Sequence, residues 1–572
     1  MKDTIPPLTS LDRISNQVIW KGCGYSDDDM DRPIIGIANA MSDMVPGHTV
    51  LDQVARQVKY GIYRAGGTPA EFGTIACCDG LAGGHSGNNY VLPSRDSIAD
   101  SIEIIARAHR LDGLVLLGSC DKIVPGMLMA AARLDLPCIF VPGGSMFSGP
   151  GYADQETSDT TSVSEAMGRL QVGEMDEAGG RRLGHVCAPT CGSCQFMGTA
   201  NSMCCLAEAL GMTLPGGAAI PAVFNERLRC ALRSGQQIVD MVHRGITPRK
   251  IMTWEALENA IMLMMAVGGS SNTVIHSCAL AHELGFDTKD VLDAFDRFSE
   301  TIPLLVKINP ATHRYDAVDF YYAGGVTQVL RQLGEKLHRE ALTVTGRTIG
   351  EEVDAYRSPY LPNDELIRPL DRPHSTLGGL AILRGNLAPD TGVSKPAAIH
   401  PDVRRFTGKA ICFDENEVRA MGRVATGVRG IKLAEGDYVI GAARARKDAY
   451  VLSITENGYG KRTPVEEFTV HHRGGGGMML HNLTEKTGLV AGIAVVDSEN
   501  DVMIITDDGV IIRTGVEEIR ECGRGSQGVI VMRTGEDVKV ISIARTDKEE
   551  EDPAEAEEET SESAENAEST EE

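Results

Sequence analysis

Short apolar runs alternate with helical stretches between residues 33 and 144, and this pattern restricts the fold more than any other feature of the chain. Runs of strand length occupy residues 33–39, 72–78, 111–117 and 138–144, and helices are predicted for residues 49–65, 94–109 and the stretch that follows residue 126. Strands that alternate with helices predict an α/β fold in which a parallel sheet carries helices on both faces.

Chemically active side chains follow two of these predicted strands. Asp79 comes directly after the second strand, and Cys120, Asp121 and Lys122 lie on the turn that leaves the third. The carboxyl ends of parallel strands are the usual place for ligands in open α/β sheets, so we expect these residues to converge at one edge. A thiolate, a hard oxygen and an amine whose charge burial can tune would then lie side by side. The alternative is a buried cysteine in a tight turn with an Asp–Lys pair on the surface.

A second cysteine motif, Cys191-x-x-Cys194, precedes a helix that is predicted to open at residues 195–203. Such a pair is compatible with a redox site, a zinc half-site or iron–sulfur ligation. Zinc would need a second matched pair, and Cys204 and Cys205 have the wrong spacing for one. A redox pair would suit a thioredoxin-like domain, for which this region is too long and too rich in glycine. Iron–sulfur ligation is therefore favoured over a structural role.

Composition and charge limit the classes of protein to consider. With 42% hydrophobic and 24% charged residues, the 572-residue chain has ordinary globular composition. No apolar run approaches the roughly 20 residues of a membrane span, and the beginning of the chain does not resemble a signal peptide, so we expect a cytoplasmic protein. The formal charge of -25 is concentrated at the end, where residues 547–572 hold 14 acids and one lysine. This tail is predicted to be disordered.

From about residue 408 the sequence repeats itself with a period of roughly 50 residues, which is typical of propeller-like blades. Residues 451–468 align with residues 502–519, and glycine clusters recur at 427–430, 474–477 and 525–528. Alternating β-branched residues between glycine turns predict an all-β region.

Motifs in the first four hundred residues carry a family resemblance. The segments 118–126, 191–201, 266–273 and 374–386 together resemble dihydroxy-acid dehydratase, within a superfamily that includes phosphogluconate and sugar-acid dehydratases. The resemblance implies dehydration of 2,3-dihydroxy acids to 2-keto acids in valine and isoleucine synthesis. It also implies an iron–sulfur cluster that acts as a Lewis acid on the C3 hydroxyl, and a magnesium ion that holds the substrate.

The resemblance assigns roles to particular residues. It implies that Cys120 and Cys194 bind the cluster, and that Asp79, Asp121 and Lys122 form the magnesium set, with a lysine that can be carbamylated.

The third cluster ligand is less clearly assigned by the resemblance. Some members place a cysteine in an early Pro-Cys-Asn loop, whereas residues 46–48 read Pro-Gly-His here. This loop resembles the [4Fe-4S] branch of the family, so a [4Fe-4S] cluster is favoured over [2Fe-2S]. Cys191 is the candidate for the third ligand, ahead of Cys78.

The dehydratase resemblance covers about residues 10–407. Members of the family continue into a second domain with a magnesium-binding glutamate in Pro-Gly-Met-x-Glu and a serine base in Asp-Gly-Arg-Phe-Ser-Gly, and neither stretch occurs here, so the catalytic base is unassigned. Segments 421–430 and 457–463 instead resemble the C-terminal β-pinwheel of DNA gyrase A, although its Gln-Arg-Arg-Gly-Gly-Lys-Gly box is absent and only two to three blades are present. That resemblance implies contact with the DNA backbone.

These observations predict a chimeric chain. A dehydratase-like α/β domain is expected at 1–370, a truncated second domain at 371–407, pinwheel blades at 408–546 and the acidic tail at 547–572. The predicted function is that of a dihydroxy-acid dehydratase working as a homodimer. The alternatives are a DNA-binding module of a type II topoisomerase, a sugar-acid dehydratase and, for the blades, one evolved β-domain that replaces the lost part.

Overall fold

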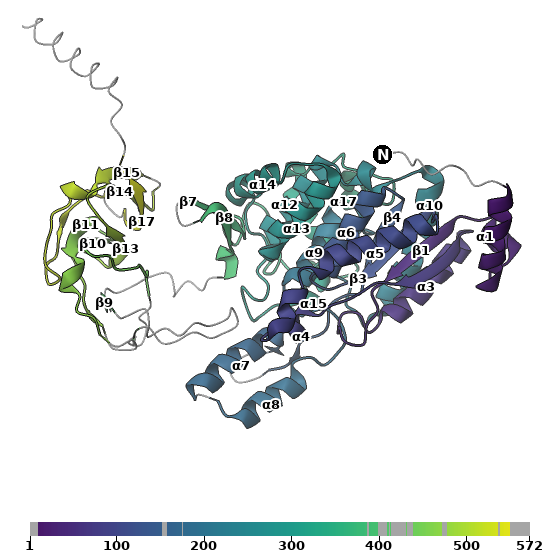
Figure 1. The fold of residues 1–572 in the computed structure, drawn as a ribbon, viewed down its shortest axis with the longest axis horizontal. Helices are drawn as coiled ribbons and strands as arrows, with labels where there is room; N and C mark the ends of the chain where they lie inside the picture. The colour runs from purple at the N-terminus through teal and green to yellow at the C-terminus, as the bar shows by residue number, and fades with distance from the viewer. Residues whose placement is uncertain are drawn as a thin grey trace, which may run out of the picture. The chain divides into compact units, whose positions relative to one another are not determined.

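The chain folds into two compact units, Met1–Ile399 and His400–Glu572 (Figure 1). The structure is a computed structural model. It describes residues 10–151, 157–173, 175–385, 388–398, 409–410, 412, 431, 439–471, 477–508, 510–535 and 538–548. The predicted motif at 421–430, most of the glycine cluster at 474–477 and the acidic tail beyond residue 548 lie outside these residues.

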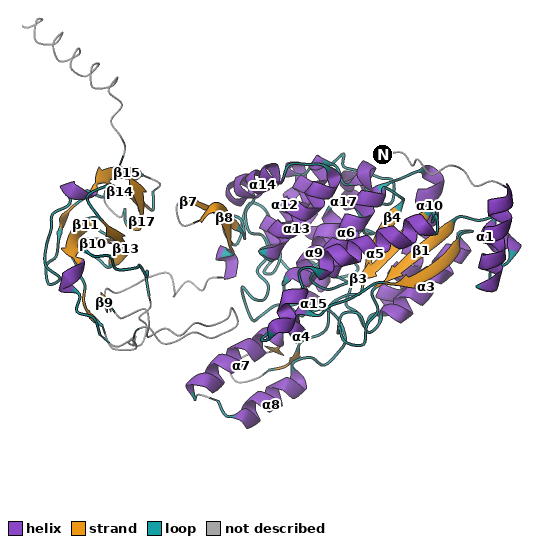
Figure 2. Cartoon of the chain, viewed as in Figure 1, coloured by secondary structure: helices purple, strands orange, loops and turns teal. Residues whose placement is uncertain are grey.

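A four-stranded parallel sheet in the order β2-β1-β3-β4 forms the centre of the first unit (Figure 2). Its strands are β1 (Ile34–Asn39), β2 (Thr68–Gly73), β3 (Gly113–Gly118) and β4 (Cys138–Pro142). All six residues of β3 are buried, as expected for an inner strand of apolar residues that is covered on both faces. The predicted parallel sheet is confirmed.

The second strand was predicted in the wrong place. The sequence favoured residues 72–78, whereas β2 spans Thr68–Gly73 and residues 74–78 form a loop. The reason is the register, because Asn39, the last residue of β1, pairs with Gly73. The Thr74 N–H still donates to the Asn39 carbonyl at 3.1 Å, but β1 ends there, and the apolar residues that follow form a loop that leads to Asp79.

Helices cover both faces of the sheet, and two glycines of β3 show how closely they approach. A Cβ on Gly113 would lie 2.9 Å from Val242 of α10 (Asn225–Arg244), and one on Gly118 would lie 2.8 Å from Ile123 of α6 (Ile123–Leu134). These glycines are five residues apart, so they point to opposite faces of the strand. The helices α3 (Leu51–Arg64) and α5 (Ser94–Ala108) complete the two layers and pack against α10 and α6, respectively.

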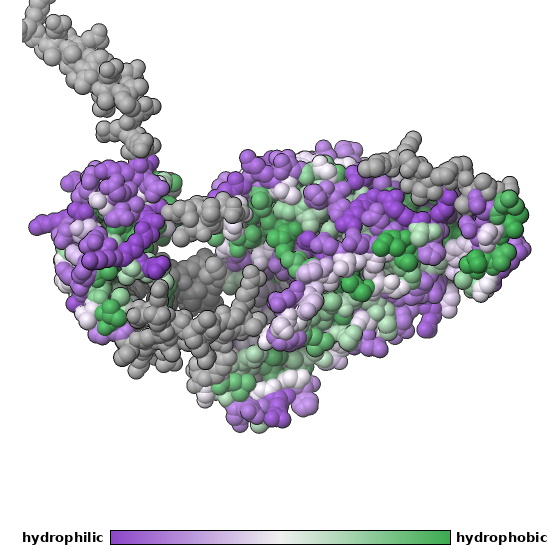
Figure 3. Space-filling view, in the orientation of Figure 1, coloured by the Kyte–Doolittle hydropathy of each residue, from purple (hydrophilic) through white to green (hydrophobic). Residues whose placement is uncertain are grey.

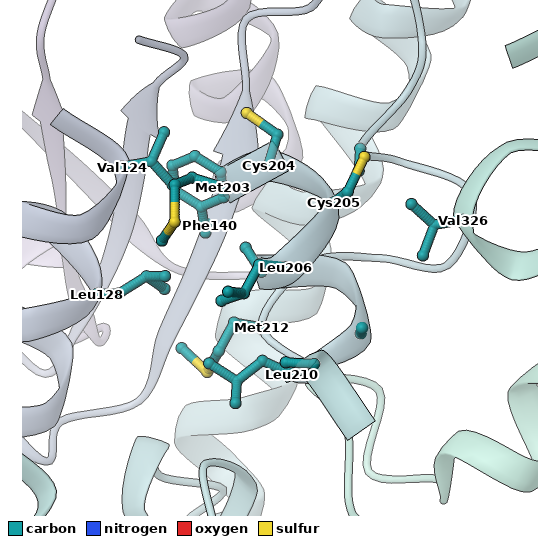
Figure 4. Close-up of a cluster of buried hydrophobic side chains, with 14 of the residues drawn as sticks. Val124, Leu128, Phe140, Met203, Cys204, Cys205, Leu206, Leu210, Met212 and Val326 are labelled. Carbon is teal, nitrogen blue, oxygen red and sulfur yellow. The ribbon is translucent and has the colours of Figure 1, made fainter. Parts of the chain in front are cut away.

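A largely buried helix, α9 (Thr199–Ala209), joins the sheet layer to the helices that follow it. It begins at Thr199, four residues after the predicted start, because the chain from Gln195 to Gly198 is still a loop. Cys204 and Cys205 of α9 belong to a cluster of buried side chains that also contains Phe140 and Leu206 (Figure 4). Burial raises the pKa of both thiols, so these two cysteines are core residues.

The remaining elements of the first unit lie around this centre. They are α1 (Ser10–Gly22), α2 (Asp27–Met30), α4 (Asp79–Ala82), η1 (Ser86–Tyr90), β5 (Gly149–Pro150), β6 (Thr157–Ser158), α7 (Thr160–Val172), α8 (Glu177–Val186), α11 (Pro248–Ile251), α12 (Trp254–Val267), α13 (Asn272–Leu284), α14 (Thr288–Thr301), α15 (Ala317–Tyr322), α16 (Gly325–Leu333), η2 (Gly334–Lys336), α17 (Ile349–Ala355), β7 (Ala381–Gly385), β8 (Ala388–Ser394) and η3 (Pro396–Ala398). Among the described residues, no helix combines the length and the apolar character needed to cross a bilayer.

Helix α1 carries an exposed apolar face. Leu11, Ile14, Val18 and Ile19 are all exposed, and Figure 3 shows hydrophobic side chains gathered over this helix. An exposed apolar patch is typical of a surface that contacts another chain. The predicted homodimer itself stays a prediction.

The second unit is all-β, as predicted. Its antiparallel sheets have the orders β13-β10-β11-β16 and β15-β14-β17, with a short pair β12-β9. The strands are β9 (Lys409–Ala410), β10 (Tyr450–Thr455), β11 (Tyr459–Pro464), β12 (Met478–Met479), β13 (Val490–Val496), β14 (Asn500–Thr506), β15 (Ile511–Gly515), β16 (Val529–Ile530) and β17 (Val540–Asp547), with short 3-10 turns η6 (Val465–Glu467) and η7 (Val516–Glu518). The aligned repeats 451–468 and 502–519 both form a hairpin followed by such a turn, and Leu452, Ile454, Val502 and Ile504 share one core.

Candidate functional site

The turn between β3 and α6 is the centre of the candidate site. Strand β3 ends at Gly118 and helix α6 begins at Ile123, so Cys120, Asp121 and Lys122 lie at the carboxyl edge of the sheet. All three side chains are buried. The alternative of an Asp–Lys pair on the surface is therefore wrong, because these charges have been removed from water and need partners inside the protein.

His48 supports this turn and is fully buried. Its Nε2 accepts hydrogen bonds from the backbone N–H groups of Ser119, at 3.0 Å, and Cys120, at 3.2 Å. Because both partners are donors, Nδ1 carries the proton and donates it to the Ala40 carbonyl at 2.6 Å. Burial lowers the pKa of His48 to about 4. His48 therefore orients the backbone of the Cys120 turn.

Two carboxylates meet at this edge. Asp79, the first residue of α4, lies near Asp121, and burial together with this neighbour raises the pKa of Asp79. Burial alone would also raise the pKa of Asp121, but interactions with His276 and Asp79 and the charge of Lys122 lower it. The Lys122 ammonium lies 2.7 Å from Asp121 Oδ1. Two like charges forced together in this way fit a site that a divalent cation completes.

Thiols lie next to the carboxylates. Burial raises the pKa of Cys120, and Cys194, Cys78 and Asp79 raise it further. The pKa of Cys194 is raised to about 11 by burial, with Asp79 and Cys78 again among the causes. The two sulfur-bearing turns predicted from sequence are therefore close enough to influence each other electrostatically, and Cys78 lies with them.

Gly47 leaves room where these segments meet. A Cβ at this position would lie 2.9 Å from the Cys120 sulfur and 3.2 Å from the Ser193 backbone nitrogen. The loop of Gly47 is tied to the Cys191–Cys194 segment, because the Gly192 N–H donates to the Pro46 carbonyl at 2.9 Å. The backbone of this segment therefore packs directly against the Cys120 turn.

Two other residues near the site are Cys191 and His85. Cys191 is half-buried in the same loop as Cys194. His85 is exposed, and its Nδ1 accepts a hydrogen bond from the Gly87 N–H at 3.0 Å. This bond caps the short helix η1.

The side chains at this edge are of the types that bind an iron–sulfur cluster and a hard cation. In the described part of the chain they do not form a ready-made site for a single metal ion. Within the part of the chain that the structure describes, no group of three or more His, Cys, Asp or Glu side chains converges on a single point that could hold a metal ion. Ligands of an iron–sulfur cluster need not converge in this way, because each thiolate binds a different iron. Magnesium is commonly held by one or two carboxylates, with water and substrate as its other ligands. Thiols and carboxylates, the ligand types that these two groups require, are therefore both present in the segments at this edge.

Comparison with known families decides the class of protein. A model of the dihydroxy-acid/6-phosphogluconate dehydratase N-terminal domain matches residues 32–352, which is more than half of the chain. The chain belongs to this family. A model of the family's C-terminal domain matches residues 365–440. The predicted dehydratase resemblance is confirmed.

Curated relatives agree with this assignment. Dihydroxy-acid dehydratase of Caldanaerobacter subterraneus subsp. tengcongensis is 46% identical over 432 residues, which cover 75% of this chain and 75% of the relative. Dihydroxy-acid dehydratase 1 of Methanosarcina acetivorans is 46% identical over 431 residues, or 75% and 76% of the two chains. The enzyme of Pyrococcus abyssi is 45% identical over 415 residues, or 72% and 74%. The predicted hydro-lyase class is confirmed.

The end of the chain matches a different family. A model of the DNA gyrase C-terminal domain, a β-propeller, matches residues 449–497 and 500–547. A solved structure of the DNA gyrase A C-terminal domain is 26% identical with a TM-score of 0.23, covering 24% of this chain and 47% of its own. The C-terminal domain of DNA topoisomerase IV is 30% identical with a TM-score of 0.24, covering 25% and 45%. The predicted gyrase-like resemblance is confirmed, and the boundaries proposed between the parts stay a prediction.

Sequence reasoning missed two residues of the site, Arg95 and His276. His276 lies in α13 and Arg95 in α5, and both reach Asp121 or its neighbours only through tertiary packing. Neither belongs to a local motif, and a histidine on a mostly apolar helix is usually a core residue. No signal within either segment could have identified them.

Proposed function

We propose that the chain dehydrates 2,3-dihydroxy acids to 2-keto acids, with an iron–sulfur cluster beside a magnesium ion. The observation that carries this proposal is the buried turn in which Cys120 and Asp121 are adjacent. Cys120 lies among other thiols, and Asp121 lies near a second carboxylate, that of Asp79. Soft and hard ligands therefore meet at one edge of the sheet.

Three thiols are proposed to hold the cluster: those of Cys120, Cys194 and Cys78. Cys78 is preferred to Cys191 because it raises the pKa of both Cys120 and Cys194 and is followed directly by the carboxylate of Asp79. Gly47 lies against the Cys120 sulfur. Residues 46–48 read Pro-Gly-His, so this loop has no thiol of its own to contribute, which supports the [4Fe-4S] form.

Asp79 and Asp121 are proposed to hold magnesium, with Lys122 beside them. A buried carboxylate whose pKa is raised retains a proton nearer neutrality, and a divalent cation displaces that proton. Cation binding should therefore tighten as the pH rises. When bound, the two metal groups supply Lewis-acid assistance to departure of the C3 hydroxyl and to loss of the C2 proton. Burial of the turn keeps bulk water away from these charges.

The acceptor of the C2 proton is not assigned to a residue. The serine and glutamate stretches of the family's second domain do not occur in this sequence. Sugar acids are the alternative substrate class.

Turnover by the intact chain is the direct test. We expect the anaerobically purified full chain to convert 2,3-dihydroxyisovalerate to its keto acid, detected as the hydrazone. The Asp121→Asn variant should lose at least about 100-fold in kcat/KM, because it removes one of two carboxylates from the cation site. A sugar acid assayed in parallel distinguishes the two substrate classes.

Iron and sulfide analysis of the same samples serves as the control. A chain that carries its cluster but turns over neither substrate would contradict the proposed activity. Equal activity in the Asp121→Asn variant would contradict the proposed cation site.

A second candidate function, DNA binding, is favoured by the match of residues 449–547 to the gyrase C-terminal model. The charge of this segment opposes it, because it holds 15 acidic and 10 basic residues. Several of the bases are also engaged within the blades. Lys461 donates to three backbone carbonyls, and Arg513 pairs with Asp501 at 2.9 Å.

Salt dependence of DNA binding tests this second candidate. Fluorescence anisotropy with a labelled duplex should show binding by the full chain only at low salt, with an affinity that falls linearly on a log–log plot as salt rises. The exposed Lys486 offers a variant, Lys486→Glu, which should weaken binding further. Absence of binding at low salt would exclude the DNA-binding function.

A further inference from the structure

A buried histidine, His276, stands behind the carboxylate pair. It comes from helix α13 and its side chain is completely removed from solvent. Its Nε2 lies 3.6 Å from Asp121 Oδ1, slightly beyond hydrogen-bond distance, and it has no closer polar partner among the described residues. The Lys122 ammonium contacts the same oxygen at 2.7 Å. Two groups on different elements therefore face one oxygen of Asp121.

Arg95 determines which nitrogen of His276 carries the proton. Its Nη1 lies 3.4 Å from His276 Nδ1, and the Arg95 side chain is only 15% exposed. A guanidinium can only donate hydrogen bonds, so Nδ1 must accept. The proton of the neutral ring then lies on Nε2 and is directed at Asp121.

These contacts form a chain from Arg95 through His276 to Asp121. We propose that Arg95 and His276 are positioning residues that hold Asp121 Oδ1 and so present Oδ2 to the divalent cation. This inference rests on the proposed function, which places that cation beside Asp79 and Asp121.

The arrangement differs from what packing alone would require. A leucine would fill an apolar position in α13 without the free-energy cost of burying the polar atoms of an imidazole. The three residues come from α5, α13 and the turn before α6, and α6 packs against both of those helices. Groups behind a metal-binding carboxylate commonly set its orientation, and their loss typically lowers metal affinity about 10–100-fold.

Binding of Mn2+ to the intact, metal-free chain tests the inference, with free Mn2+ measured by electron paramagnetic resonance. His276→Leu and Arg95→Met should weaken Mn2+ binding about 10–100-fold. His276→Gln should recover most of the affinity, because an amide can accept from Arg95 and donate to Asp121. Arg95→Lys should also recover most of it, because it keeps a donor. Native affinity in both His276→Leu and Arg95→Met, with unchanged unfolding midpoints, would overturn the inference.

A second measurement separates this inference from the proposed function. Nitrogen-15 spectra of histidine side chains in the metal-free chain, assigned through the signal lost in His276→Gln, should show the Nε2–H form and a change in Arg95→Met. The Nδ1–H form in the native chain would overturn the inference whatever the metal result. If Asp121→Asn binds Mn2+ as the native chain does, the proposed cation site is wrong, and the tautomer alone decides whether Arg95 controls His276.

Discussion

Replacement of Cys78, Cys120 or Cys194 by serine is expected to abolish the visible iron–sulfur absorbance of the anaerobically purified chain, whereas Cys191→Ser is expected to keep it. The first three thiols influence one another electrostatically at the edge of the sheet. A serine hydroxyl is a poor ligand for iron compared with a thiolate, so loss of any one of them should leave the cluster incompletely held.

The four variants form a matched set, because each makes the same one-atom change. Iron and sulfide content measured with the visible spectrum distinguishes loss of the cluster from a shift of its absorbance, and Cys23→Ser, at an exposed position, is the control. Retention of the cluster in Cys120→Ser would contradict the whole cluster proposal. Loss of the cluster in Cys191→Ser, together with its retention in Cys78→Ser, would instead support Cys191, the third ligand that the sequence favoured.

Acidification is expected to weaken the first unit through His48. The pKa of this histidine falls from 6.5 in the unfolded chain to about 4 in the buried site. Between these values the unfolded state binds the proton more tightly, so the free energy of unfolding falls as pH decreases through this range. Between pH 7 and pH 4, protonation of His48 should therefore lower the free energy of unfolding by about 3 kcal/mol.

The variant His48→Leu isolates this effect. At pH 7 it should be less stable by about 2–5 kcal/mol, because the N–H groups of Ser119 and Cys120 lose their acceptor. As the pH falls to 4, the difference in the free energy of unfolding between the native chain and the variant should shrink by about 3 kcal/mol. The reason is that the variant has no histidine to protonate at this position.

Urea unfolding of the metal-free chain measures both quantities. Tryptophan fluorescence follows the first unit alone, because the chain has two tryptophans, Trp20 and Trp254, and both lie in it. His109→Leu, at an exposed position, is the control and should follow the native curve. If the difference in the free energy of unfolding between the native chain and His48→Leu did not change with pH, His48 would not be buried in the uncharged form.

Much of the sheet could be predicted from local patterns. Apolar runs identified β1, β3 and β4, and helical periodicity identified α3, α5 and α6, because burial on both faces leaves a clear pattern in each segment. The end of β2 could not be found in this way. It depends on where β1 stops, since a strand at the edge of a sheet extends only as far as its neighbour pairs with it.

The all-β character of the second unit was predictable for a different reason. Residues 451–468 and 502–519 repeat one hairpin, and a repeat shows its period without any knowledge of contacts. Packing of the two hairpins into one core, with Leu452 and Val502 together, appears only in the folded unit.

The sequence alone placed Asp79 after the second predicted strand and the Cys120–Lys122 turn after the third, and it therefore predicted thiol and carboxylate chemistry at one edge of the sheet. Only the tertiary structure decided which groups support that edge. The hydrogen bonds from the Cys120 turn to His48, and the approach of Arg95 and His276 from two different helices, cannot be inferred from the spacing of these residues along the chain. Proximity between distant segments arises from packing of whole elements, so the supporting residues of a site become visible only when the layers are assembled.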